Sequence, residues 1–187
     1  MTRPDVLVGF MGAGKSTVGP RLAELRDTAF VDVDRELERR TARSIPDLFA
    51  EGEDAFRDRE EALIRELVEG GSYGVIAPGG GALTRPGTRA LLRERARVLH
   101  LDAPVETLWE RVEAEGGAAA RPLAVNLHRF ADLHAQRQSL YLTAADAIVD
   151  AAADPEVVAI AARDAGVVRP GALARLRSEE HTSELQS

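Results

Sequence analysis

The sequence predicts an α/β domain of three layers, in which helices flank a parallel sheet of five strands. Two observations predict this fold class. Short apolar runs alternate along the chain with longer segments whose apolar residues recur at helical spacing. A glycine-rich turn also follows the first apolar run and opens the first helical segment, as in βα units that bind phosphate. The length of 187 residues suits one such domain.

Five short apolar or alternating runs, each bounded by turn residues, are expected to be the strands. They cover residues 5–10, 29–34, 73–77, 97–102 and 147–150. Helices are expected between and after them, over residues 15–26, 88–95, 104–115 and 127–142 and after Asp154. Two further helical segments lie between the second and third strands, with breaks near residues 44–46 and 51–52. The intervening helices make the neighbouring strands parallel.

The composition argues against several classes of protein. A net charge of -7 disfavours sequence-independent binding to nucleic acid, which requires a basic surface. The chain has no cysteine, so it contains neither a disulfide framework nor thiolate chemistry. No apolar run has the length of a signal peptide or a membrane span. We therefore expect a cytoplasmic protein that binds neither nucleic acid nor a membrane.

The C-terminal end differs in character from the rest of the chain. Residues 177–187, RSEEHTSELQS, are polar and look like the in-frame translation of a common sequencing adapter. A disordered acidic tail is the alternative interpretation. In either case we expect a single domain over residues 1–168 and a tail over residues 169–187.

The glycine-rich turn reads GFMGAGKST and satisfies the phosphate-binding pattern G-x-x-x-x-G-K-[ST]. Backbone N–H groups of such a loop surround phosphate oxygens, a lysine reaches the β- and γ-phosphates, and a hydroxyl binds Mg²⁺. The pattern predicts that ATP and Mg²⁺ bind here, with phosphate contacts from Gly12, Ala13, Gly14, Lys15, Ser16 and Thr17.

Two carboxylates follow at the end of the second predicted strand, in the segment VDVD. Alternation along a strand is expected to direct Asp32 and Asp34 to the same side. Because the carboxyl ends of parallel strands form the ligand crevice, both are expected beside the phosphate loop, near Mg²⁺ and an acceptor hydroxyl. A pair of surface carboxylates is the alternative.

Three further segments carry candidate site residues. Arg57 lies three residues before Glu60 on a predicted helix, where an exposed ion pair is the alternative to a functional role. Gly79, Gly80 and Gly81 end the third strand and allow close approach to a backbone. The small-residue segment around ARPLA, over residues about 114–126, suits a lid in which Arg121 neutralises charge on a transferring phosphoryl group.

Together these motifs resemble the shikimate kinase family, which consists of P-loop small-molecule kinases with the nucleoside-monophosphate-kinase-like fold. The resemblance runs from about residue 6 to residue 165. It rests on GFMGAGKSTVG, FVDVD, SIPDLFAEGEDAFRDRE, GGGAL and RPL, and on R-x-x-x-Y at Arg137 and Tyr141, in the order and spacing of the family. A packed tyrosine with an exposed arginine is the alternative interpretation of this last pair.

The resemblance implies transfer of the ATP γ-phosphate to the 3-hydroxyl of shikimate, in the biosynthesis of aromatic amino acids, by a monomer. It implies that Lys15, Asp34 and Arg121 are catalytic, and that Ser16 and Asp32 bind Mg²⁺. It assigns contacts with the adenine to Arg111 and Pro155. The residues that it assigns to shikimate are Asp34, Arg57, Gly79, Gly80, Gly81 and Arg137.

Two other functions remain open at this point. A gluconate kinase of the same fold would share the phosphate loop but should lack the combination of Asp34, Arg57, Gly80 and Arg137. A non-catalytic nucleotide-binding regulator would be favoured by loss of Lys15, Asp32 or Arg121, and all three are present.

Overall fold

The computed structural model describes residues 3–116 and 126–166. These residues form a five-stranded sheet in the order β2-β3-β1-β4-β5, and all of its neighbouring strands are parallel. The strands are β1 (Asp5–Val8), β2 (Phe30–Asp32), β3 (Val75–Ala77), β4 (Arg97–Asp102) and β5 (Ala147–Asp150). The predicted fold class is confirmed.

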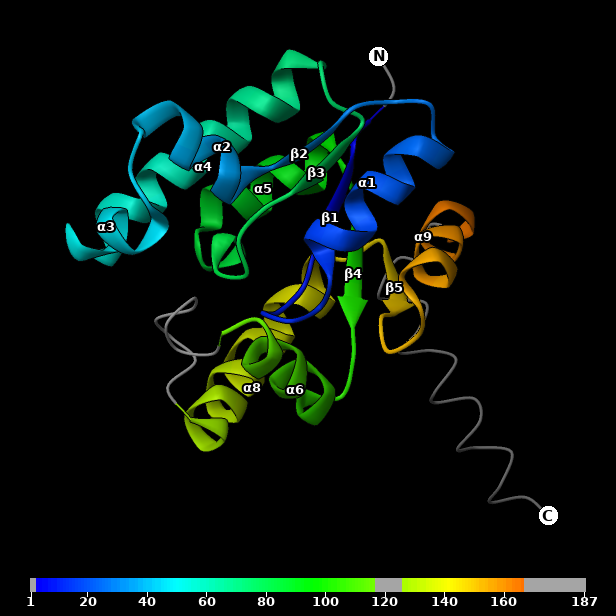
Figure 1. The fold of residues 1–187 in the computed structure, drawn as a ribbon. Coiled ribbons are helices and arrows are strands. Elements are labelled where there is room, and N and C mark those ends of the chain that lie inside the picture. Colours follow the sequence, from blue (N-terminus) through cyan, green and yellow to red (C-terminus); the bar gives the residue numbers. More distant parts are fainter. Residues whose placement is uncertain (1–2, 117–125, 167–187) are drawn as a thin grey trace, which may run out of the picture.

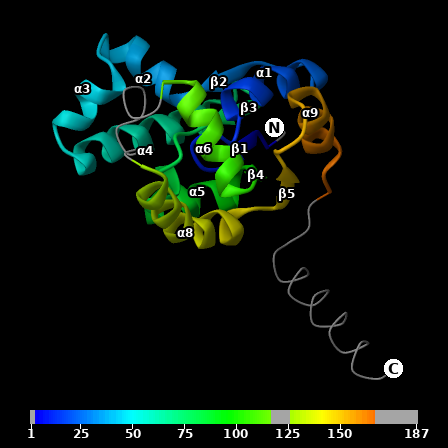
Figure 2. The ribbon, with the colours of Figure 1, turned by 60° about the horizontal axis from the view of Figure 1, so that its bottom comes forward.

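Helices cover both faces of the sheet. They are α1 (Lys15–Leu25), α2 (Val33–Thr41), α3 (Ile45–Ala50), α4 (Glu53–Gly70), α5 (Pro86–Arg95), α6 (Val105–Ala114), α8 (Leu127–Ala144) and α9 (Pro155–Asp164), with a short 3₁₀ helix, η1 (Ala82–Thr84). Figure 1 shows α2, α3 and α4 grouped beyond the β2 edge of the sheet. Figure 2 shows α1 and α9 on one side of the strands, and α5 and α8 on the other.

The central strands are buried on both faces, as expected of a parallel sheet between two helical layers. Every residue of β1 and β3 is buried, and their apolar side chains belong to one continuous core that extends into the flanking helices. This rigid centre fixes the loops that leave the carboxyl ends of the strands.

The two most important loops follow neighbouring strands. β1 pairs with β3, with Val6 opposite Ile76, yet the helices that follow these strands, α1 and α5, lie on opposite sides of the sheet. Parallel sheets bind ligands where the chain diverges in this way. The glycine-rich turn after β1 and the three glycines after β3 therefore meet at one edge.

The structure corrects two details of the predicted secondary structure. β2 ends at Asp32, and Val33 and Asp34 already belong to α2, because the Asp32 side chain caps this helix by accepting a hydrogen bond from the Arg35 N–H (3.2 Å). A third helix, α3, lies where a break between two helices was predicted, and the Ser44 side chain caps it.

Most of the predicted lid, including Arg121, and the tail over residues 169–187 lie outside the described residues. Within the part that the structure describes, no helix combines the length and the apolar character that a membrane span requires.

Candidate active site

The glycine-rich turn places the N-terminus of α1 at the edge of the sheet. Gly12 (φ 79°) and Gly14 (φ 82°) adopt left-handed backbone conformations, which glycine tolerates best. A Cβ atom at Gly12 would also overlap the backbone carbonyl of Leu108. Lys15 Nζ donates hydrogen bonds to the carbonyls of Gly9 (2.8 Å) and Phe10 (3.2 Å), so the lysine lies along the loop. The loop thus has the shape that its sequence pattern predicts.

A polar cavity of about 350 Å³ lies over this turn. Its lining includes every predicted phosphate contact from Gly12 to Thr17, together with Asp32, Asp34, Gly79, Gly80 and Glu115. Ser16 Oγ donates to Asp32 Oδ2 (2.5 Å), while Asp32 Oδ1 caps α2. A hydroxyl and a carboxylate side by side are oxygen ligands of the kind that Mg²⁺ prefers, so these residues fit the predicted ion.

A neighbouring hollow follows the outer side of the same loop. It is lined by Arg111 and Pro155 as well as by Gly12, Ala13, Gly14 and Thr17. Arg111 Nη1 donates to the carbonyls of Gly12 (3.3 Å) and Ala151 (2.9 Å), and so links the phosphate loop to the segment before α9. The two residues predicted to flank the adenine therefore lie together, next to the phosphate cavity.

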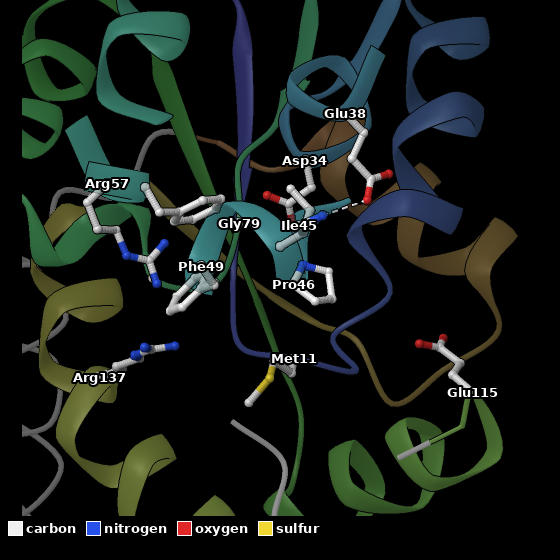
Figure 3. A pocket seen from close by; sticks show the side chains of 13 residues that line it. Met11, Asp34, Glu38, Ile45, Pro46, Phe49, Arg57, Gly79, Glu115 and Arg137 are labelled. Atoms are coloured by element: carbon white, nitrogen blue, oxygen red, sulfur yellow. Dashed lines mark hydrogen bonds between the residues drawn. The ribbon is translucent and has the colours of Figure 1, made fainter. Parts of the chain in front are cut away.

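A second cavity, of about 270 Å³, adjoins the phosphate cavity. Figure 3 shows Arg57 and Arg137 entering it from one side, with Phe49 between them and Asp34 farther along. Apolar side chains of Met11, Ile45, Pro46 and Phe56 complete much of its wall. All the residues predicted to bind shikimate line this cavity: Asp34, Arg57, Gly79, Gly80, Gly81 and Arg137.

Asp34 lines both cavities, but from a helix and not from the predicted strand. The side chain belongs to the first turn of α2 and not to the alternating face of β2. Because Asp32 caps α2, the first turn of this helix places Asp34 at the carboxyl ends of the strands. Gly79 and Gly80 also line both cavities and form the other part of the shared wall.

Arg57 forms the predicted pair with Glu60, but the pair is buried and not exposed. The two side chains are 6% and 1% exposed, and Arg57 Nη1 lies 2.6 Å from Glu60 Oε2. The guanidinium carbon also lies over the rings of Phe49 (5.4 Å) and Phe56 (5.1 Å), which is the geometry of a cation–π contact. This packing fixes the direction in which the guanidinium faces the cavity.

The pKa of Glu60 is raised to about 7, mainly by burial; the nearby Arg57 opposes this shift, and the charge of Asp34 adds to it. The Gly79 backbone packs against Glu60, so closely that a Cβ atom there would overlap the carboxylate. The Arg57–Glu60 pair therefore also supports the loop of three glycines.

Arg137 is buried as well, at 6% exposure, and the alternative of an exposed arginine is wrong. Burial lowers the pKa of its guanidinium. Among the described residues Arg137 has no ion pair with a carboxylate; its guanidinium lies over the ring of Phe10 (5.8 Å) and interacts electrostatically with Tyr141. A buried cation that faces a cavity in this way is suited to an anionic ligand.

Sequence reasoning missed some of the residues that shape these cavities. Glu115, at the end of α6, lines all three, and Phe49 and Phe56 hold Arg57 in place. No periodicity marks Glu115, whereas the two phenylalanines belong to the segment SIPDLFAEGEDAFRDRE that carried the family resemblance.

Comparisons with known proteins agree with this geometry. The family model described as shikimate kinase matches residues 11–165. A shikimate kinase from Aromatoleum aromaticum is 41% identical over 146 residues, which cover 78% of this chain and 83% of that protein. A shikimate kinase from Acinetobacter baumannii, solved in complex with shikimate, superposes with a TM-score of 0.75 at 35% identity, covering 100% of this chain and 97% of the other.

A gluconokinase from Sinorhizobium meliloti is also similar, with 16% identity, a TM-score of 0.51 and 97% of each chain covered; at this identity the likeness shows a common fold alone. The family model spans most of the chain, and the relatives share over a third of their residues with it. The chain belongs to the shikimate kinase family.

Proposed function

We propose that this chain transfers the γ-phosphoryl group of ATP to the 3-hydroxyl of shikimate. The observation that carries the proposal is the pair of adjoining cavities that share Asp34. One is lined by a phosphate-binding loop, and the other contains two buried guanidinium groups. A cyclic hydroxy acid has the matching chemistry, with a carboxylate for the arginines and hydroxyls for the aspartate.

In this proposal the phosphate cavity holds the nucleotide. Backbone N–H groups of residues 12–17 contact the phosphates, Lys15 reaches the β- and γ-phosphates, and Arg111 and Pro155 flank the adenine. Ser16 and Asp32 would hold Mg²⁺, which neutralises charge on the phosphate oxygens when bound.

The second cavity holds the acceptor. Arg57 and Arg137 bind the shikimate carboxylate, a task for which planar guanidinium groups are well suited. Asp34 accepts a hydrogen bond from the reacting hydroxyl and takes its proton as the oxygen attacks phosphorus. Gly79, Gly80 and Gly81 let the ring approach the backbone closely.

Arg121 remains part of the proposal although it lies outside the described residues. Its role, inferred from the sequence, is to neutralise the charge that develops on the transferring phosphoryl group as a lid closes over residues about 114–126. We also propose a monomeric, cytoplasmic enzyme, and the net charge of -7 supports the absence of nucleic-acid binding.

An assay of ADP release tests the acceptor. Purified protein with MgATP is given shikimate, quinate or gluconate at equal concentrations, and ADP formation is followed by a coupled assay. The proposal predicts the highest kcat/KM for shikimate. Preference for gluconate would overturn it in favour of a sugar-acid kinase, and ADP release from none of the three would favour a non-catalytic nucleotide-binding protein.

A further inference from the structure

Tyr141 lies behind the acceptor cavity and not in its lining. It is on α8, one helical turn after Arg137, and only 2% of it is exposed. Its hydroxyl donates a hydrogen bond to the carbonyl of Gly80 and interacts electrostatically with Arg137, one turn earlier on the same helix. One buried hydroxyl therefore bonds to the glycine loop and lies on the same face of α8 as Arg137.

The backbone of Gly80 also lies close to the phosphate loop. A Cβ atom on Gly80 would lie 3.4 Å from the Gly9 carbonyl, 3.6 Å from the Tyr141 hydroxyl and 3.7 Å from the Met11 nitrogen. A trans peptide holds its C=O and N–H in opposite directions, so binding of the Gly80 carbonyl to Tyr141 directs the Gly81 N–H away from α8. The hydroxyl thus fixes the orientation of the glycine loop.

The ring of Tyr141 is itself fixed. It stacks on the ring of His100, with centroids 5.1 Å apart and an angle of 29° between the planes. His100 is 1% exposed, and burial lowers its pKa to about 4, so it is neutral at physiological pH. Burial raises the pKa of Tyr141 to about 12, so the hydroxyl keeps the proton that it donates to Gly80.

We propose that Tyr141 is a positioning residue whose hydroxyl fixes the Arg137 guanidinium relative to the glycine loop, and thereby sets the acceptor cavity for the substrate carboxylate. A guanidinium has several N–H donors, so an interaction of Arg137 with the hydroxyl leaves other donors to the ligand. This inference rests on the proposed function, since it concerns the binding of shikimate.

The test removes only the hydroxyl of Tyr141. Tyr141→Phe keeps the ring that stacks on His100, and Tyr73→Phe removes the other tyrosine hydroxyl of the chain as a matched control. We expect Tyr141→Phe to raise the KM for shikimate roughly five- to thirtyfold, as for loss of a hydrogen bond to a charged group, with the KM for ATP and kcat changed by less than about threefold. Tyr73→Phe should change none of these values.

A double-mutant cycle separates positioning from general loosening of the fold. If Tyr141 acts through Arg137, Tyr141→Phe should change the KM for shikimate by less than about twofold when Arg137→Lys is already present. In the background of Arg57→Lys it should keep most of its effect.

Several outcomes would overturn the inference. They are an unchanged KM for shikimate in Tyr141→Phe, equal changes in the KM values of both substrates, full additivity with Arg137→Lys, or loss of folding by circular dichroism. In each case the proposed function still holds as long as the wild-type protein phosphorylates shikimate. A wild-type protein that does not phosphorylate shikimate overturns both.

Discussion

The phosphate cavity and the acceptor cavity share a wall but are assembled in different ways. The proposed phosphate contacts come from one continuous stretch, residues 12–17, at the start of α1. The acceptor cavity takes side chains from α2, α3, α4 and α8 and backbone from the loop after β3. A local loop can be identified from a short motif, whereas the second cavity exists only when several distant segments have folded together.

The largest effect is expected at Asp34, where the two cavities meet. Asp34→Asn should lower kcat roughly 10²–10⁴-fold, because the amide cannot take the proton of the acceptor hydroxyl. The KM for ATP should change little. Asp132→Asn, at an exposed position of α8, is the control. A kcat within about threefold of wild type would remove Asp34 from the mechanism.

Two glycine variants test whether the two cavities bind different substrates. Gly12→Ala should raise the KM for ATP about tenfold and lower Tm, because a left-handed residue with a side chain costs roughly 1–2 kcal/mol and the new Cβ atom would overlap the Leu108 carbonyl. Gly81 has an ordinary φ of -100°, and its new Cβ atom would displace the Arg57 guanidinium. Gly81→Ala should therefore raise the KM for shikimate alone.

If both glycine variants changed the same KM value, the assignment of ATP and shikimate to separate cavities would be contradicted. Measurements of both KM values and of the thermal transition decide between the two outcomes.

The same contrast explains what could be predicted from the sequence. The order of strands and helices and the phosphate loop followed from local patterns, because apolar periodicity and glycine positions act within a few residues. The helical position of Asp34 did not, since the Asp32 cap ended β2 earlier than its alternating pattern indicates. The alternating pattern favours a longer strand, whereas an aspartate cap favours an earlier start of the helix. The capping hydrogen bond decides for the helix.

Burial of the two arginines was the other feature beyond local reasoning. An arginine three residues before a glutamate is usually an exposed pair on a helix. Arg57 is buried because Phe49, from another helix, packs against it, and Arg137 because α8 lies against the glycine loop. Only the resemblance to a family brought these residues into one site before the fold was known.

The stability of the folded protein should depend on pH through the buried Arg57–Glu60 pair, in contrast to exposed ion pairs. The pKa of Glu60 is about 7 in the folded protein, against an ordinary value of 4.5. Between these values the folded state retains a proton that the unfolded state has lost. The stability that this proton provides is complete below pH 4.5 and is lost as the pH rises through 7, by about 3 kcal/mol.

Glu60→Gln should not show this loss, so its stability relative to wild type should increase from pH 5 to pH 8. Urea unfolding across this range measures the slope, with Glu69→Gln, exposed on the same helix, as the control. Equal slopes for wild type and Glu60→Gln would contradict the buried, protonated carboxyl.

The smallest effect is expected from the C-terminal end. Deletion of residues 177–187 should leave Tm, kcat and both KM values unchanged, because this polar segment has no apolar face to bury. Calorimetry and the ADP-release assay test this expectation. A fall of several degrees in Tm would show that the segment belongs to the domain and is not an adapter-like addition.

The two KM values of the arginine variants test the central claim most directly. In Arg57→Lys and Arg137→Lys the charge remains but the planar fork is lost. We predict a higher KM for shikimate, by a factor equivalent to about 1–3 kcal/mol, an unchanged KM for ATP, and no effect in the control Arg129→Lys. Arg121→Ala should instead lower kcat while shikimate binding survives. If Arg57→Lys weakens only the binding of ATP, the two arginines do not bind the shikimate carboxylate, and a gluconate-type acceptor becomes the better account.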